Sequence, residues 1–260
     1  MVPDSAACHS CRSPQQRIPA IAMAFQPIVH LPSREIYAYE ALVRGPQGQP
    51  AAWVFEQISP EGHYHFDQLC RVTAIRAAAR LGLHKHGTAR LSINFLPNAV
   101  YEAATCLRTT LRTAQDVQFP LNRLLFEITE HESVTDEQHV RTIIETYRSH
   151  GFQTALDDYG AGHATAGLLL ALRPDVVKID MKLVRGVHED HWREELIRHL
   201  AQFADRVGIL LIAEGVESAD EARCLLALGV THMQGYYFAH PGFECLPTIP
   251  DEAYAQATAQ

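Results

Sequence analysis

Short apolar runs typical of β-strands alternate with helical segments over most of the chain, from residue 89 to residue 233. The strand-like runs occupy residues 89–94, 124–129, 153–157, 175–179, 209–213 and 230–233. This alternation is typical of a parallel sheet whose strands are joined by helices. Two further runs, at residues 25–30 and 36–43, come first and are close enough to form a hairpin. Together they predict a closed (β/α)8 barrel, a fold that usually needs about 250 residues.

An open, doubly wound parallel sheet is the competing architecture, but no Gly-x-Gly-x-x-Gly motif opens a helix. The chain has 260 residues, of which 47% are apolar, so it can bury a substantial core in one large domain. We expect a flexible N-terminal tail over residues 1–21, which are polar and contain proline. We expect the domain itself over residues 22–245 and an irregular C-terminal tail over residues 246–260.

The net charge of the chain limits which classes of partner it can bind. A formal net charge of -8 argues against a protein that grips long nucleic acid or an anionic membrane. No apolar stretch is long enough to span a bilayer, and the N-terminus lacks a basic-then-apolar signal pattern, so we expect a cytoplasmic protein. Cys8 and Cys11 have the spacing of metal ligands, but no second pair follows at zinc-finger distance. We therefore interpret them as part of the tail.

Two adjacent carboxylates, Asp157 and Asp158, stand at the end of one apolar run and are followed by Gly160 and Gly162. Neighbouring side chains of a regular strand point to opposite faces, so both acids reach one site only if the strand stops there. The glycines permit such a stop. Two acids at one point repel each other, and a bound metal cation is a natural reason to place them together. A solvated turn, where Asp and Gly are common, is the alternative.

Polar residues gather at the C-terminal ends of the other apolar runs as well. Seven residues share this placement: Glu40, Asn94, Glu127, Asp157, Asp158, Lys178 and Glu214. In a parallel barrel those ends meet at one rim, where active sites are built. Any single member could be a loop acid, a turn residue or part of a rim salt bridge. Seven at the same end favour a functional site.

The donor atoms of this set indicate which metal would bind. Carboxylate and amide oxygens without clustered Cys or His select hard cations, Mg²⁺ or Mn²⁺. The five acids could hold two ions if Asp157 bridges them, and two ions about 4 Å apart suit in-line displacement at phosphorus. Lys178 can orient the nucleophile or stabilise developing charge, and Arg44 can pair with a phosphate oxygen. The residues therefore predict a two-metal phosphoesterase.

The motifs around these residues resemble those of the EAL-domain cyclic di-GMP phosphodiesterase family. The first motif is Glu40-Ala-Leu-Val-Arg44. The later blocks follow in the family's order: Ile93-Asn94, Phe126-Glu127-Ile-Thr-Glu130, Asp157-Asp158-Tyr-Gly160, Lys178-Ile-Asp180, Ala213-Glu214-Gly-Val-Glu217 and Gln234-Gly-Tyr236. The resemblance covers roughly residues 22–242. It implies a barrel whose first strand is antiparallel to the others, and hydrolysis of cyclic di-GMP to linear pGpG.

The resemblance also implies a role for each matching residue. The metal ligands are Glu40, Asn94, Glu127 and Asp157, with Asp158 and Glu214 serving the second ion directly or through water. The catalytic set is Lys178, which holds the attacking water, Glu214, and Glu130, which steadies the loop after the paired acids. The substrate-binding set is Arg44 at the phosphate, with Gln26, Asp180, Glu217 and Gln234. We expect Mg²⁺ or Mn²⁺ as cofactors and Ca²⁺ to be inhibitory, because its longer bonds and looser geometry spoil the reacting alignment.

The loop after the paired acids departs from the family. Tyr159 replaces the usual Phe, and residues 160–167 read Gly-Ala-Gly-His-Ala-Thr-Ala-Gly where the family carries a Tyr-Ser-Ser stretch. In the family this loop supports dimerisation and couples it to the metals, so the departure bears on regulation and rate. The resemblance as a whole implies a homodimer. An upstream sensor or regulator is a further expected partner. A receptor that binds cyclic di-GMP without cleaving it and a protein-interaction module are the alternatives, and the complete ligand set favours the enzyme.

Overall fold

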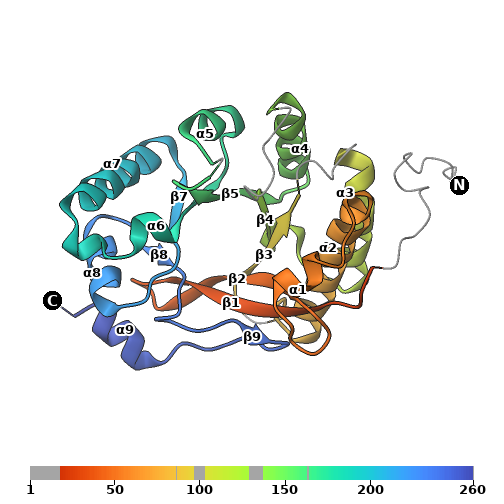
Figure 1. Ribbon diagram of the computed structural model, residues 1–260, viewed down its shortest axis with the longest axis horizontal. Helices are drawn as coiled ribbons and strands as arrows, with labels where there is room; N and C mark the ends of the chain where they lie inside the picture. Colours follow the sequence, from red (N-terminus) through yellow and green to blue (C-terminus); the bar gives the residue numbers. More distant parts are fainter. Residues whose placement is uncertain (1–17, 86, 97–102, 129–136, 163, 260) are drawn as a thin grey trace, which may run out of the picture.

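The computed structural model describes residues 18–85, 87–96, 103–128, 137–162 and 164–259. Within them, eight strands form a closed barrel in the order β2-β3-β4-β5-β6-β7-β8-β1, and β1 pairs again with β2 (Figure 1). The strands are β1 (Ala22–His30), β2 (Glu35–Arg44), β3 (Arg90–Phe95), β4 (Leu124–Ile128), β5 (Gln153–Tyr159), β6 (Val176–Ile179), β7 (Leu210–Ala213) and β8 (His232–Met233). Strands β2 to β8 run parallel, whereas β1 is antiparallel to both neighbours. The predicted (β/α)8 barrel with an antiparallel first strand is confirmed.

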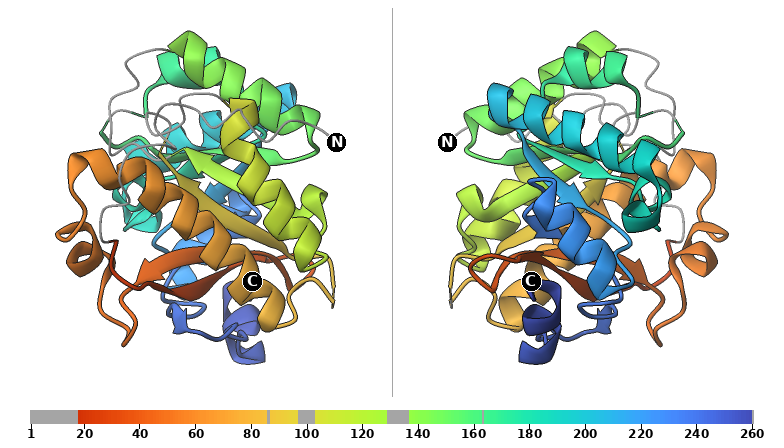
Figure 2. Two further views of the ribbon diagram at one scale, coloured as in Figure 1. Left: turned by 90° about the vertical axis from the view of Figure 1, so that its right-hand side faces the viewer. Right: turned by 90° about the vertical axis from the view of Figure 1, so that its left-hand side faces the viewer.

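Helices cover the outside of this barrel, with α2, α3 and α4 on one side and α7 and α8 on the other (Figure 2). The helices are α1 (Ala51–Phe55), α2 (His63–Arg80), α3 (Ala103–Asp116), α4 (Glu137–Ser149), α5 (Ala166–Leu172), α6 (Met181–Val184), α7 (His191–Val207), α8 (Ala219–Ala227) and α9 (Asp251–Ala257). Short 3-10 turns lie at Pro60–Gly62, Leu121–Arg123 and Val187–Glu189. A ninth strand, β9 (Gly242–Phe243), pairs with β1 outside the ring. None of the helices in the described part is both long and apolar enough to cross a bilayer.

The alternation of side chains along the strands divides the core into two layers. In β4, Phe126 packs in the large cluster between the barrel and the helices, whereas Leu125 packs inside the barrel. The inner layer is small and consists of Ile28, Ala38, Leu125, Ala155, Val176 and Ile212. Glu127 follows Leu125 by two residues and therefore points to the same interior. The apolar inner layer thus forms a floor beneath the polar residues of the rim.

Strand β5 does not stop at Asp157, contrary to the expectation from the sequence. It continues to Tyr159, and its pairing with β6 shifts register between Leu156 and Tyr159. Asp158 has a φ of 50°, in the left-handed region that non-glycine residues seldom adopt. An irregularity of this kind breaks the alternation of side chains and re-aims one of them. The two acids do converge, but a bulge within the strand is the cause.

The C-terminal segment is irregular only in part: residues 246–250 have no regular structure, but residues 251–257 form α9, which the sequence did not predict. Tyr254 and Ala257 of α9 are buried. Tyr237 Oη donates to the Ala253 carbonyl at 2.8 Å, and Arg223 Nη1 donates to the Gln256 carbonyl at 2.7 Å. Helix α9 therefore packs against the barrel. Its seven residues are too few to show a clear helical period in the sequence.

An aromatic cluster with two histidines closes the barrel where β1 meets β8. His232 pairs with His30 across the strands, and their ring centroids lie 4.6 Å apart. The Tyr37 ring lies 4.8 Å from that of His232, and the Arg90 guanidinium lies over Tyr37. Burial lowers the pKa of His232 from 6.5 to about 4, and the nearby charges of His30 and Arg90 add to this effect.

This cluster predicts acid-sensitive folding. Between pH 6.5 and pH 4 the unfolded chain binds a proton at His232 that the folded protein excludes, so stability falls as the pH falls. We expect the wild type to lose about 2 kcal/mol more unfolding free energy than His232→Phe when the pH drops from 7.5 to 5. Urea unfolding of both proteins at the two pH values measures this difference. Equal losses would show that His232 keeps an ordinary pKa.

Candidate active site

The barrel brings the polar residues predicted from the sequence to one rim. They come from successive elements: Glu40 on β2, Asn94 on β3, Glu127 on β4, Asp157 and Asp158 on β5, Lys178 on β6, and Glu214 directly after β7. Gln26 on β1 and Gln234 directly after β8 complete the ring. The carboxyl ends of parallel strands meet at this edge, so segments far apart in the sequence build one site.

Lys178 occupies the middle of the site. Its Nζ atom lies 2.6 Å from Glu214 Oε1, 2.8 Å from Glu127 Oε2, 2.9 Å from Asp157 Oδ1 and 3.6 Å from Glu40 Oε2. The Lys178 side chain is only 1% exposed. Burial opposes its charge, but the four carboxylates outweigh burial and raise the pKa of Lys178. One ammonium group faces four carboxylates, so the cluster carries an excess of negative charge.

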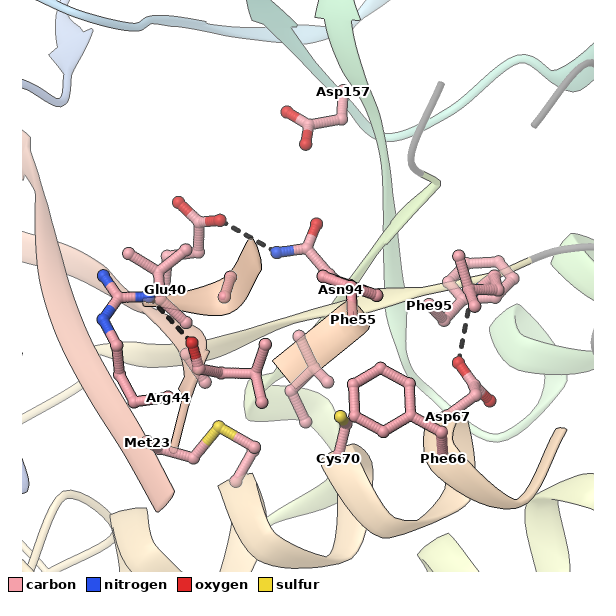
Figure 3. Close-up of a pocket in the computed structure, with 17 residues that line it drawn as sticks. Met23, Glu40, Arg44, Phe55, Phe66, Asp67, Cys70, Asn94, Phe95 and Asp157 are labelled. Carbon is pink, nitrogen blue, oxygen red and sulfur yellow. Dashed lines mark hydrogen bonds between the residues drawn. The ribbon is translucent and has the colours of Figure 1, made fainter. Parts of the chain in front are cut away.

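Two side-chain amides fix Glu40. Asn94 Nδ2 donates to Glu40 Oε1 at 2.9 Å (Figure 3), and Gln234 Nε2 donates to Glu40 Oε2 at 2.7 Å. Gln234 also contacts Gln26 Oε1 at 3.2 Å, and Gln26 Nε2 donates to the Ala239 carbonyl at 3.2 Å. Burial works against ionisation of Glu40, but Lys178 and the amide donors outweigh it and lower the pKa of this carboxyl. Glu40 is therefore held as a carboxylate.

Glu127 is fully buried at the floor of the site. Its Oε1 accepts a hydrogen bond from Ser92 Oγ, and its Oε2 accepts one from Lys178 Nζ. Burial raises the pKa of Glu127 to about 8; Lys178 opposes the shift, and the charges of Glu40 and Asp157 add to it. Ser92 was not predicted from the sequence. It lies two residues before Asn94 on β3, so strand alternation could have placed it on the same inward face.

Asp157, Asp158 and Glu214 form a second group of carboxylates. One oxygen of each lies within 4.8 Å of the others. Burial raises the pKa of Glu214; Lys178 opposes this, while Asp157 and the other acids of the cluster add to it. Asp157 belongs to this group and also lines the cavity that contains Glu40 and Asn94. Its position fits a ligand shared between two cations.

The donor atoms of the site fit divalent cations. Within the described part of the chain, Asn94 Oδ1 is buried without a hydrogen-bond partner, while Asn94 Nδ2 is bonded to Glu40. Buried polar oxygens are normally satisfied, so this atom is available to a ligand. Buried carboxylates in excess of their cationic partners need further positive charge. Oxygen donors alone suit Mg²⁺ or Mn²⁺ rather than a metal that prefers sulfur or imidazole.

Two cavities flank the carboxylates and share Glu40. The first has a volume of about 300 Å³ and lies beside the ends of β2 and β3, with Phe55 and Phe66 among its apolar walls (Figure 3). The second has a volume of about 290 Å³ and lies beside the ends of β7 and β8, with polar walls that include Asp180 and Glu217. The charged centre therefore lies between an apolar chamber and a polar one.

The predicted substrate-binding residues divide between these cavities. Arg44 lines the first, where its Nη1 donates to the Val43 carbonyl at 2.8 Å. Four line the second cavity: Gln26, Asp180, Glu217 and Gln234. Asp180 also caps α6 by accepting a hydrogen bond from Lys182 N at 2.8 Å. Glu217 forms an ion pair with Arg185, a residue of the second cavity that the sequence did not single out.

Three residues named from the sequence cannot be placed. Glu130, Cys8 and Cys11 lie outside the described residues. The role expected for Glu130 and the interpretation of the two cysteines therefore stay predictions.

Two features define the class of protein. The fold is a (β/α)8 barrel with an antiparallel first strand, and its rim at the carboxyl ends of the strands holds buried carboxylates around a lysine. The pattern of the EAL domain matches residues 14–241. The chain therefore belongs to the EAL domain family.

Solved structures of this family resemble the chain over most of its length. A standalone versatile EAL protein from Vibrio cholerae O395, solved in a c-di-GMP bound form, is 46% identical with a TM-score of 0.87, covering 92% of this chain and 99% of that one. Klebsiella pneumoniae BlrP1, solved as a manganese/cy-diGMP complex at pH 9.0, is 29% identical with a TM-score of 0.81, covering 89% of this chain and 59% of BlrP1.

The curated relatives are longer than this chain. The cyclic di-GMP phosphodiesterase PdeL of Escherichia coli K12 is 31% identical over 119 residues, which are 46% of this chain and 33% of PdeL. The blue light- and temperature-regulated antirepressor BluF of the same organism is 28% identical over 226 residues, 87% of this chain and 55% of BluF. The chain thus spans about half of BluF and a third of PdeL, and these two relatives are named for different roles.

Proposed function

We propose that this chain hydrolyses cyclic di-GMP to linear 5'-pGpG with the help of two divalent cations, Mg²⁺ or Mn²⁺. The observation that carries the proposal is the buried cluster of carboxylates around Lys178, which lies between two cavities. The c-di-GMP bound form of the Vibrio cholerae EAL protein supports the choice of substrate. The manganese/cy-diGMP complex of BlrP1 supports the choice of cofactor.

The two groups of carboxylates suggest how the ions would be shared. Glu40, Asn94, Glu127 and Asp157 would hold one ion, and Asp157, Asp158 and Glu214 the other. When bound, the ions would supply positive charge against the phosphate and would make the attacking water more acidic. Gln234 supports the first group, because it donates to Glu40. A group that hydrogen-bonds to a metal ligand in this way fixes the orientation of that ligand.

Lys178 and Glu214 would act on the attacking water. Lys178 Nζ, already 2.6 Å from Glu214 Oε1, can hold the water, and the Glu214 carboxylate can accept its proton. The water oxygen bonds to phosphorus while the bond from phosphorus to the ribose 3'-oxygen breaks. The departing oxygen takes a proton from solvent, so pGpG has a 5'-phosphate at one end and a 3'-hydroxyl at the other. Glu130 is proposed to steady the loop after the paired acids.

The two cavities suit a dinucleotide whose halves lie on either side of the carboxylates. The apolar walls of the first can cover a base, and Arg44 can contact a phosphate oxygen there. The second offers carboxylates and amides to the donor and acceptor atoms of the other guanine, through Gln26, Asp180, Glu217 and Gln234. A receptor that binds cyclic di-GMP without cleaving it is the alternative, and a protein-interaction module is a weaker one.

A homodimer is proposed because α5 and α7 expose large apolar side chains. Leu170 of α5 is 65% exposed, and Trp192 and Leu196 of α7 are 87% and 53% exposed. Exposed apolar surface of this kind commonly marks a protein interface. We further propose a cytoplasmic location, regulation by an upstream sensor, and a domain over residues 22–245 with a flexible tail before it. These proposals await size-exclusion measurements and experiments in cells.

The function is tested by incubating the purified chain with cyclic di-GMP and chromatographing the products. We expect pGpG with Mg²⁺ or Mn²⁺, none after removal of metal by EDTA, and little with Ca²⁺, whose coordination is longer and looser. Recovery of activity on adding Mn²⁺ back controls for irreversible damage. Tight binding of cyclic di-GMP with both metals but no product would establish the receptor instead.

Arg44→Ala should weaken substrate binding while leaving metal binding in place. Losing a charge-assisted contact to phosphate raises KM about 10-fold or more, corresponding to about 1.5–3 kcal/mol. Steady-state kinetics measure KM, and calorimetric titration with Mn²⁺ alone measures the metal. Loss of Mn²⁺ binding in this variant would contradict the role given to Arg44.

A further inference from the structure

A buried ion pair lies on the helix side of strands β3 and β4, and its acidic member, Asp67, also lines the first cavity. Arg71 of α2 is fully buried and forms an ion pair with Asp67 one helical turn earlier, itself 3% exposed. Arg71 Nη1 also donates to Tyr147 Oη of α4 at 2.9 Å. The pair therefore joins α2 to α4 across the outside of the two strands. Burying two charges is costly, so the pair by itself is weak evidence of a gain in stability.

The position of Arg71 relates it to two of the proposed metal ligands. Its guanidinium lies 5.7 Å from the ring centroid of Phe95 and 6.0 Å from that of Phe126. Phe95 directly follows Asn94, and Phe126 directly precedes Glu127. Because side chains alternate along a strand, the rings face Arg71 on the outside while Asn94 and Glu127 face the barrel interior. Arg71 thus packs behind both ligand-bearing strands.

Asp67 contacts the end of β3 directly. Its Oδ1 accepts a hydrogen bond from Leu96 N at 3.0 Å (Figure 3), and its Oδ2 pairs with Arg71. Strand β3 pairs with β2 only as far as Ile93, and with β4 only as far as Phe95. Leu96 is the first residue of this segment that pairs with neither neighbouring strand. The hydrogen bond to Asp67 therefore holds the backbone just beyond the end of the sheet.

We infer that Asp67, oriented by Arg71, is a positioning residue that holds Asn94 in place to bind a divalent cation. This inference rests on the proposed function, since it concerns the same metal site. Asn94 lies two residues before Leu96, whose N–H donates to Asp67, and Asn94 Oδ1 is one of the buried oxygens that have no hydrogen-bond partner in the described part of the chain. A small rotation of this strand end would move that oxygen away from the carboxylates.

Two double variants isolate the hydrogen bond from the buried charge. Asp67→Asn with Arg71→Met keeps an oxygen that can accept from Leu96 N, whereas Asp67→Leu with Arg71→Met removes it. Both remove the two charges together, and replacing a whole buried pair by neutral groups is far better tolerated than breaking it. Arg123→Gln is the matched control. Arg123 binds the carbonyls of Leu83 and Ala89 at the opposite end of the same two strands.

Calorimetric titration of the full chain with Mn²⁺ alone is the test. We expect Asp67→Asn with Arg71→Met, and the Arg123→Gln control, to bind Mn²⁺ with the wild-type Kd within about threefold. Asp67→Leu with Arg71→Met should bind about 10-fold more weakly. Equal affinity in the two double variants, whether both near wild type or both weakened, would overturn the inference and leave the proposed function standing. Failure of the wild type to bind Mn²⁺ would overturn both.

Hydrogen exchange at the Leu96 amide of the wild-type protein gives a second test, which does not require any variant to fold. If Asp67 holds the strand end before any metal binds, the Leu96 amide should exchange with solvent as slowly in metal-free protein as the amides within β3. Hydrogen exchange followed by mass spectrometry or NMR reports this rate. Fast exchange at Leu96 in the metal-free chain would overturn the inference.

Discussion

Lys178→Met should unfold more easily than the wild type when metal is absent, and should recover much of that loss when Mn²⁺ is present. Lys178 Nζ contacts three carboxylates within 2.9 Å. Removing one partner of a buried charged pair typically costs about 3–5 kcal/mol, because the remaining charge is left uncompensated. Bound cations would replace the lost positive charge. Urea unfolding with EDTA and with saturating Mn²⁺ measures both values.

The same variant should lose at least about 10³-fold in turnover, which corresponds to about 4 kcal/mol of transition-state stabilisation. Lys182→Met is the matched control, since Lys182 lies four residues further on, at an exposed position of α6. It should keep wild-type turnover and stability. If Lys178→Met lost equal stability with and without Mn²⁺, the ions would not bind beside Lys178, and the proposed metal site would be wrong.

Glu40→Ala should abolish turnover, with a loss of about 10³-fold or more, and should do so without the stability loss of Lys178→Met. Glu40 is the carboxylate that both Asn94 and Gln234 contact, and it would be a ligand of the first ion. Its removal costs two hydrogen bonds but also relieves repulsion among the remaining carboxylates. We therefore expect the metal-free unfolding free energy to change by less than about 1.5 kcal/mol.

Glu35→Ala controls for loss of a glutamate from the same strand, because Glu35 is exposed at the opposite end of β2. It should keep wild-type turnover and Mn²⁺ affinity. Product chromatography and calorimetric titration test the two variants side by side. Retained turnover in Glu40→Ala would count against a metal centre at this rim. A small stability change in Glu40→Ala, beside a large loss in Lys178→Met, would support an excess of negative charge there.

The amino-acid sequence by itself determined the barrel and the set of polar residues that share the rim, and the family resemblance of its motifs implied the antiparallel first strand. The barrel and the rim residues follow from local patterns: apolar runs mark each strand, and a polar residue at the end of a run shows which end is functional. Glu40, Asn94, Glu127 and Lys178 were predicted this way, and the structure brings them together. Their roles as ligands and catalyst remain predictions.

Only the tertiary structure decided how these groups face one another. The left-handed conformation of Asp158 within β5, the hydrogen bond from Ser92 to Glu127, and the support of Leu96 by Asp67 depend on contacts between separate segments. The central position of Lys178 among four carboxylates also required closure of the barrel. Local patterns record which face a residue occupies, whereas distances across the barrel arise only when all eight strands pack together.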